Sequence, residues 1–179
     1  MKKYSELLGL ARESIAIAFE AKELKINEAV KKKYSKKQAC FVTLTIKGDL
    51  RGCIGSLEAR QELWKDVAEN ARNAAFNDSR FMPLTKEELA KIKIEISILA
   101  VPKRISYKDA EDLKKKIKGK GVVLGKGFNS ATYLPQVWQE INDSEEFLSS
   151  LCRKSGLPSD AWKKEKLKVL VYSVDKIEE

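Results

Sequence analysis

One stretch of sequence decides the fold: Cys40-Phe41-Val42-Thr43-Leu44-Thr45-Ile46, followed by Lys47-Gly48-Asp49 and by Leu50-Arg51-Gly52-Cys53-Ile54-Gly55. The first run is apolar and rich in β-branched residues, and the glycine-containing turn predicts a hairpin into a second strand. Glycine inside a strand gives up packing and stiffness, so Gly52 and Gly55 indicate a bulge or a close approach to the backbone. The hairpin therefore predicts a site as well as a piece of sheet.

Hydrophobic periodicity predicts the helices and strands of the rest of the chain. It predicts helices over residues 4–26, 61–76, 85–92, 107–118 and 144–154. It predicts further strands at residues 93–98, 122–124, 131–134 and 168–174, and a polar connector at 27–37. The order is mixed, without a clean βαβ alternation, and no repeat of fixed period is found. We therefore expect an α+β fold of mainly antiparallel sheet with flanking helices.

The composition indicates a water-soluble protein. The chain has 179 residues, 43% hydrophobic, which is enough for one domain or for two small subdomains that share a core. No window approaches the roughly 18 consecutive apolar residues of a membrane span. The first residues lack the apolar segment of a signal peptide, so a cytoplasmic location is expected, with no membrane partner.

The histidine and cysteine counts exclude several chemistries. The sequence has no histidine, which removes the commonest general base, the usual zinc and iron ligands, and any Ser-His or Cys-His dyad. The three cysteines, Cys40, Cys53 and Cys152, show no paired spacing, and an odd number favours reduced thiols. We therefore expect no metal site and no cofactor.

The net charge of +9 permits two interpretations. A lysine-rich surface that keeps the protein soluble is favoured, because few aromatic residues lie among the lysines. The alternative is attraction of nucleic acid or another polyanion, for which Lys31 to Lys37 is the best patch in the sequence.

Four polar residues near the hairpin or on the following elements are candidates for chemistry. Cys53 is a possible nucleophile, since a cation such as Arg51 two residues away favours a thiolate; the alternative is a small buried cysteine. Asp78 and Arg80 either orient a substrate or pair with each other. Glu95 is either a general base or the partner of a cross-strand lysine. The glycine pairs lack the context of a phosphate-binding or dinucleotide-binding loop.

Four ordered motifs resemble one family. They are residues 50–55, Phe76-Asn77-Asp78-Ser79-Arg80-Phe81-x-Pro83-Leu84, Ile94-Glu95-Ile96-Ser97-Ile98-Leu99, and Ala131-Thr132-Tyr133-Leu134-Pro135-Gln136-Val137-Trp138. Together they are similar to the AMMECR domain family. The resemblance covers nearly the whole chain and implies one domain over residues 1–179, built from two intertwined subdomains with a cleft between them.

The resemblance also implies where a site lies, although the biochemical activity of the family is not established. It places Arg51, Cys53, Asp78, Arg80, Glu95 and Gln136 at the cleft, with Gly52 and Gly55 beside them. In many prokaryotes, the genes of the family that this chain resembles lie beside, or are fused to, genes for a Memo-like protein of dioxygenase-type fold and a radical-SAM enzyme. These two are the partners that the resemblance implies, and modification of a nucleic-acid base or a small aromatic substrate is the role it suggests.

Three hypotheses for function follow. The first is an accessory domain that binds a small anionic ligand, RNA or a partner enzyme, in which Arg51 and Arg80 supply charge-assisted hydrogen bonds and Asp78 holds an arginine in place. The second is a thiol-dependent enzyme with Cys53 as nucleophile and Glu95 as base. The third is a nucleic-acid binder that uses Lys31 to Lys37.

Overall fold

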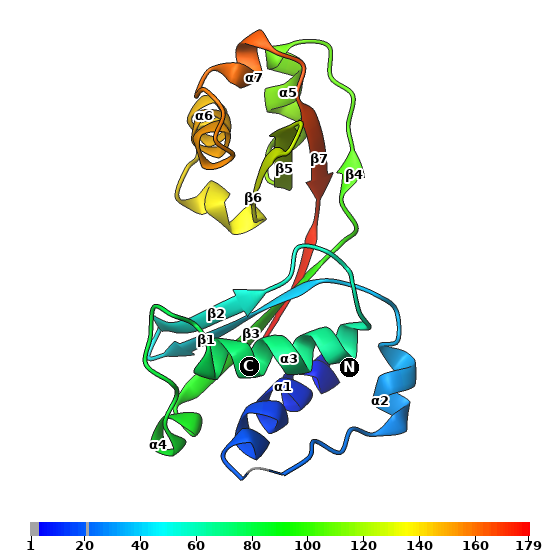
Figure 1. Ribbon diagram of the computed structural model, residues 1–179, viewed down its shortest axis with the longest axis vertical. Helices are drawn as coiled ribbons and strands as arrows, with labels where there is room; N and C mark the ends of the chain where they lie inside the picture. The colour runs from blue at the N-terminus through cyan, green and yellow to red at the C-terminus, as the bar shows by residue number, and fades with distance from the viewer. Residues whose placement is uncertain (1–3, 21) are drawn as a thin grey trace. The chain divides into compact units, whose positions relative to one another are not determined.

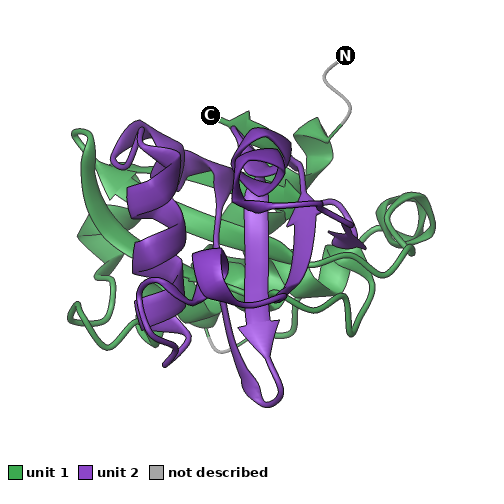
Figure 2. Ribbon diagram, turned by 90° about the horizontal axis from the view of Figure 1, so that it is seen from above, with its two compact units in different colours: residues 1–99, 175–179 green, residues 100–174 purple. Residues whose placement is uncertain are grey.

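The computed structural model describes residues 4–20 and 22–179, which form two compact units. Unit 1 comprises the described residues of Met1–Leu99 together with Asp175–Glu179, and unit 2 comprises Ala100–Val174 (Figure 2). Unit 2 is therefore inserted between the last two strands of unit 1. Each unit has its own four-stranded sheet, so the fold is α+β as predicted. Among the described residues, no helix has the length and hydrophobicity that crossing a bilayer requires.

Unit 1 combines a sheet of strand order β2-β1-β3-β8 with helices (Figure 1). Its elements are α1 (Ser5–Ala18), α2 (Glu28–Lys33), β1 (Cys40–Ile46), β2 (Asp49–Gly55), α3 (Leu63–Phe76), α4 (Lys86–Leu89), β3 (Ile92–Leu99) and β8 (Val174–Glu178). The turn between β1 and β2 has positive φ at Lys47 (55°) and Gly48 (93°), as a type I′ hairpin requires. The hairpin predicted at this place is confirmed.

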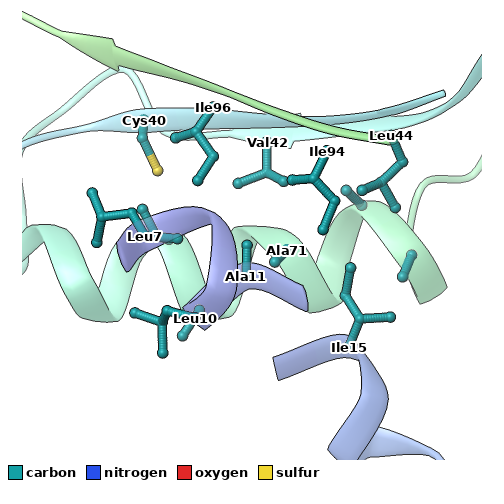
Figure 3. Packing of buried hydrophobic residues seen from close by; sticks show 14 of the residues in the cluster. Leu7, Leu10, Ala11, Ile15, Cys40, Val42, Leu44, Ala71, Ile94 and Ile96 are labelled. Atoms are coloured by element: carbon teal, nitrogen blue, oxygen red, sulfur yellow. The ribbon is translucent and has the colours of Figure 1, made fainter. Parts of the chain in front are cut away.

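The core of unit 1 lies between one face of the sheet and helices α1 and α3. Figure 3 shows side chains of β1 and β3 pointing toward these helices. The buried residues that the figure labels are Leu7, Leu10, Ala11, Ile15, Cys40, Val42, Leu44, Ala71, Ile94 and Ile96. The alternation along β3 puts Ile94, Ile96 and Ile98 in this core, as the strand predicted at 93–98 requires. Ile92 also lies in β3 and in the core, whereas it was predicted to belong to the preceding helix, which ends at Leu89. The opposite face of the sheet is called the outer face below.

Unit 2 has the strand order β4-β7-β5-β6. Its elements are β4 (Lys103–Arg104), α5 (Ala110–Ile117), β5 (Gly121–Lys126), β6 (Asn129–Tyr133), the 3₁₀ helix η1 (Pro135–Gln139), α6 (Ser144–Lys154), α7 (Ala161–Lys164) and β7 (Lys168–Tyr172). Its core contains the stacked rings of Trp138 and Phe147, whose centroids lie 3.9 Å apart, and the buried Trp162. The strand pairs β1–β2 and β1–β3 of unit 1 and β4–β7, β5–β6 and β5–β7 of unit 2 are antiparallel.

Several predicted element boundaries were wrong. The helix predicted over residues 4–26 ends at Ala18, because charged residues interrupt the apolar stripe beyond Phe19. The predicted connector 27–37 contains α2, which Asn27 caps by accepting the N–H of Ala29 at 2.8 Å. The predicted strand 168–174 ends at Tyr172, and β8 follows. Strand β8 was not predicted, because only two of its residues, Val174 and Ile177, are apolar.

Candidate functional site

A β-bulge at Arg51 determines where the residues of β2 point. Leu44 pairs with Gly52, but Thr45 pairs with Leu50, which leaves Arg51 without an opposite residue on β1. A regular hairpin with this turn would pair Cys53 with Val42, on the core face. The bulge instead pairs Cys53 with Thr43, on the outer face. Gly52 and Gly55 indicated a bulge or a close approach in this strand, and the bulge lies at Arg51, beside Gly52.

Arg51 forms a two-point ion pair with Glu88 of α4. Its Nε lies 2.9 Å from Oε1 of Glu88, and its Nη2 lies 2.9 Å from Oε2. The two side chains are 15% and 26% exposed, and the hydrogen bond from Arg51 lowers the pKa of Glu88. The third nitrogen, Nη1, is buried and has no hydrogen-bond acceptor among the residues that the structure describes. The guanidinium lies over the ring of Phe81, 5.9 Å from its centroid. The contacts of Arg51 therefore join the bulge to α4.

Cys53 is held by the loop that follows α3. β2 is an edge strand, so the backbone groups of Cys53 that point away from β1 need other partners. Its N–H donates to Oδ2 of Asp78 at 2.9 Å, and its carbonyl accepts from Nη2 of Arg80 at 3.4 Å. Two side chains thus take the place of a neighbouring strand at this residue.

Asp78 and Arg80 also pair with each other, which is one of the two roles considered from the sequence. Nε and Nη2 of Arg80 lie 3.0 and 2.7 Å from the two carboxylate oxygens of Asp78. The Asp78 side chain is 4% exposed, whereas that of Arg80 is 55% exposed. The hydrogen bonds from Arg80 hold the pKa of Asp78 well below its usual range, and those bonds raise the pKa of Arg80, with a smaller contribution from the nearby Cys53. Arg80 is a fixed cation beside a thiol.

The thiol of Cys53 begins a polar row across the outer face. Oγ1 of Thr43 donates to Sγ of Cys53 at 3.2 Å. Thr43 is paired on its other side with Glu95 of β3, and Glu95 accepts from Nζ of Lys176 on β8 at 2.6 Å. Cys53 and Glu95 are two strand spacings apart, about 10 Å. Thr43 therefore lies between the predicted nucleophile and the predicted base.

The two glycines of the hairpin accommodate parts of the protein itself. A Cβ at Gly52 would lie 2.1 Å from the carbonyl oxygen of Ala74 in α3. A Cβ at Gly55 would lie 2.3 Å from the ring of Phe41 and 2.5 Å from the carbonyl oxygen of Cys40. The close approach predicted from the sequence is thus that of a helix and a ring to β2.

A buried carboxylate that the sequence analysis missed fixes the end of β2. Oδ1 of Asp66 accepts from Ser56 at 2.9 Å, and Oδ2 accepts from the backbone N–H of Cys40 at 2.9 Å. Asn70 donates to the same Oδ2 at 3.0 Å and to the carbonyl of Cys40 at 3.2 Å. No motif pointed to Asp66, although a carboxylate in the apolar stripe of a predicted helix is unusual enough to have been a signal.

The structure brings most of the predicted site residues together in unit 1. Arg51, Gly52, Cys53, Gly55, Asp78 and Arg80 lie along β2 or on the loop after α3, and Glu95 lies two strands away. Gln136 is half-buried on η1 and belongs to unit 2. The described part of the chain contains no group of three or more His, Cys, Asp or Glu residues that could hold a metal ion.

The comparisons with known proteins agree with the architecture. The family model named AMMECR1 matches residues 8–177. A protein of Aquifex aeolicus is 42% identical over 173 residues, 94% of this chain and 88% of that one. Protein NEQ441 of Nanoarchaeum equitans is 38% identical over 97% of this chain and 98% of its own. The crystal structure of the uncharacterized protein PH0010 from Pyrococcus horikoshii superposes with a TM-score of 0.86 at 33% identity, covering 99% of this chain and 92% of that one. The chain belongs to the AMMECR1 family.

Proposed function

We propose that this protein binds a small anionic ligand, bearing a carboxylate or a phosphate, at the part of unit 1 where Arg80 adjoins Cys53. One observation carries the proposal. The guanidinium of Arg80 is anchored at two points on the buried carboxylate of Asp78, yet its side chain is 55% exposed. A guanidinium that is already oriented loses little conformational entropy when it binds an oxyanion.

The remaining donors of Arg80 suit this role better than those of Arg51. Arg80 uses Nε and Nη2 in its contacts with Asp78 and Cys53, so Nη1 stays available to an incoming oxygen. Nε and Nη2 of Arg51 already donate hydrogen bonds to Glu88, and its Nη1 is buried. We therefore assign ligand binding to Arg80 and an anchoring role to Arg51, with Asp78 as the positioning residue.

A titration of the ¹H–¹⁵N spectrum with inorganic phosphate and, separately, with acetate tests the proposal. We expect saturable shifts of the Arg80 Nε and Cys53 backbone resonances with at least one probe. Arg80→Gln should weaken that binding about tenfold or more, since a charge-assisted hydrogen bond contributes about 1.5–3 kcal/mol. Arg60→Gln is the matched control, because Arg60 is an exposed arginine paired with Glu58. Equal affinities of the two variants, or no saturable shift with either probe, would refute the proposal.

A second candidate, thiol chemistry at Cys53, is favoured by a different observation. Thr43 donates a hydrogen bond to Sγ, and the same cysteine lies beside the cation of Arg80, the kind of surroundings in which reactive cysteines are found. Alkylation by iodoacetamide at neutral pH discriminates between the two candidates. Faster alkylation of Cys53 than of free cysteine would favour catalysis, and slower alkylation would favour binding alone. Cys40 and Cys152 are internal controls, because burial raises the pKa of both thiols.

A further inference from the structure

The lysines of α2 and of the turn after it differ in how their charges are compensated. Lys31 pairs with Glu28 at 2.7 Å, and Lys33 pairs with Glu6 at 2.5 Å. Lys32, Lys36 and Lys37 are exposed and have no carboxylate within 4.0 Å among the described residues. Three uncompensated ammonium groups thus lie within six consecutive residues. They are called the three free lysines below.

The backbone that carries these lysines is fixed to the start of α3. The N–H of Leu63 donates to the carbonyl of Lys36 at 3.0 Å, and Lys37 forms an isolated β-bridge with Glu62. Tyr34, between the lysines, is buried, and its carbonyl accepts from the N–H of Trp64 at 3.4 Å. An ordered backbone lowers the entropy cost of binding a partner. A polar connector was predicted here, and the structure instead has a helix and a tethered turn.

An aromatic ring lies beside the lysines. Nζ of Lys31 is 5.8 Å from the centroid of the Trp64 ring, and Trp64 is half-buried at the start of α3. Lys65, the next residue, is exposed and has no carboxylate partner among the described residues. Cations next to an aromatic ring are the combination with which proteins hold single strands, the cations on phosphates and the ring on a base.

We propose that the three free lysines, together with Lys65 and Trp64, form a binding surface for single-stranded nucleic acid. The surface is distinct from the site at Cys53 and does not depend on it. A lipid surface fits less well. The exposed large apolar side chains among the described residues are Leu50, Leu57, Met82, Val101 and Phe128, and none of them belongs to this segment. A peripheral membrane contact would need such side chains.

The test is the fluorescence anisotropy of a short labelled oligouridylate over a series of KCl concentrations. The variant Lys32→Gln/Lys36→Gln/Lys37→Gln is compared with Lys115→Gln/Lys120→Gln/Lys168→Gln. The second set removes the same charge from exposed lysines of unit 2 that also lack a carboxylate partner within the described residues. We expect the first variant to bind about tenfold more weakly or worse and the second to bind like the wild type.

The salt dependence should change in parallel. Each phosphate contact to a single strand contributes about −0.7 to the slope of log K against log salt, so losing three contacts should make the slope about 2 less negative. Trp64→Leu should weaken binding without changing the slope. Three results would overturn the proposal: equal losses in both triple variants, tighter binding to a duplex of the same length, or binding to phosphatidylserine vesicles but not to the oligonucleotide. Thermal melting of each variant verifies that it is folded.

Discussion

The carboxylate of Asp78 accepts the backbone N–H of Cys53, with Oδ2 and the nitrogen 2.9 Å apart, although the two residues are 25 positions apart in the sequence. The bond occupies an edge-strand donor that would otherwise be free to pair with another chain. It also connects the residue that carries the thiol to the residue that orients Arg80. Disturbing Asp78 should therefore affect stability and the candidate site together.

Asp78→Asn should destabilise the protein by about 1.5–3 kcal/mol, because it removes charge-assisted hydrogen bonds from a buried position. The pKa of Asp78 is lowered in the folded state by its bonds with Arg80. The contribution of Asp78 to the free energy of unfolding is thus complete above its pKa in the unfolded chain, about 4. It is lost as the pH falls from there toward the lower pKa that Asp78 has in the folded protein. Urea unfolding at neutral pH and at a series of acidic pH values measures both effects.

The wild type should therefore lose stability more steeply than Asp78→Asn as the pH falls below about 4. Asp49→Asn is the control, because Asp49 is an exposed carboxylate at the start of β2. Parallel pH profiles for the wild type and Asp78→Asn would contradict the assigned role of the carboxylate.

The pair of Arg51 and Glu88 should be coupled energetically. Arg51→Gln and Glu88→Gln are each expected to destabilise the protein by about 1–3 kcal/mol, because each leaves a largely buried charge without its partner. The double variant should lose less than the sum of the two, with a coupling energy of about 1–2 kcal/mol. Urea unfolding of the wild type, the two single variants and the double variant gives the double-mutant cycle from which the coupling energy is calculated. Strictly additive losses would mean that the ion pair does not anchor β2 to α4.

Gly52→Ala should strongly destabilise unit 1. The new Cβ would lie 2.1 Å from the carbonyl oxygen of Ala74, so strand and helix must separate. Overpacking of this kind costs about 1–3 kcal/mol or more. Gly9→Ala is the matched substitution in α1, where nothing lies within 4 Å of the added atom, and it should stabilise the protein by about 0.5–1 kcal/mol. The two thermal melting temperatures should therefore move in opposite directions, and a neutral Gly52→Ala would show that β2 does not pack on α3 this closely.

The sequence predicted α6 with correct boundaries and the hairpin to within one residue, because local signals determine them. The turn residues Lys47 and Gly48 determine the first, and Asp143, which accepts the N–H of Glu146, determines the start of the second. The capping box of Thr85 and Glu88 was likewise predictable from spacing. The same Glu88 also pairs with Arg51, and this partner lies too far away in the sequence for spacing to reveal it.

The arrangement of the candidate site could be predicted only in part. Spacing identified Cys53, Asp78 and Arg80, but the face on which the thiol lies depends on the bulge at Arg51. One extra residue in a strand reverses the direction of every side chain beyond it. Gly52 and Gly55 indicated a bulge or a close approach, but not that the unpaired residue is Arg51. Thr43 was not predicted as the neighbour of Cys53 for the same reason, since a regular hairpin would have paired Thr43 with Gly52.

Asp66 should be among the least replaceable residues of unit 1, because its two oxygens accept four hydrogen bonds at a position that is 3% exposed. Asp66→Ala leaves donors of Cys40 and Asn70 buried without acceptors, at about 1–3 kcal/mol for each. Asp66→Asn should rescue little, because an amide turns its NH₂ group toward two donors where a carboxylate oxygen accepted them. Urea unfolding should therefore give similar losses for Asn and Ala, with Asp49→Asn within about 0.5 kcal/mol of the wild type. If the asparagine variant is as stable as the wild type, the carboxylate of Asp66 is not what fixes the end of β2.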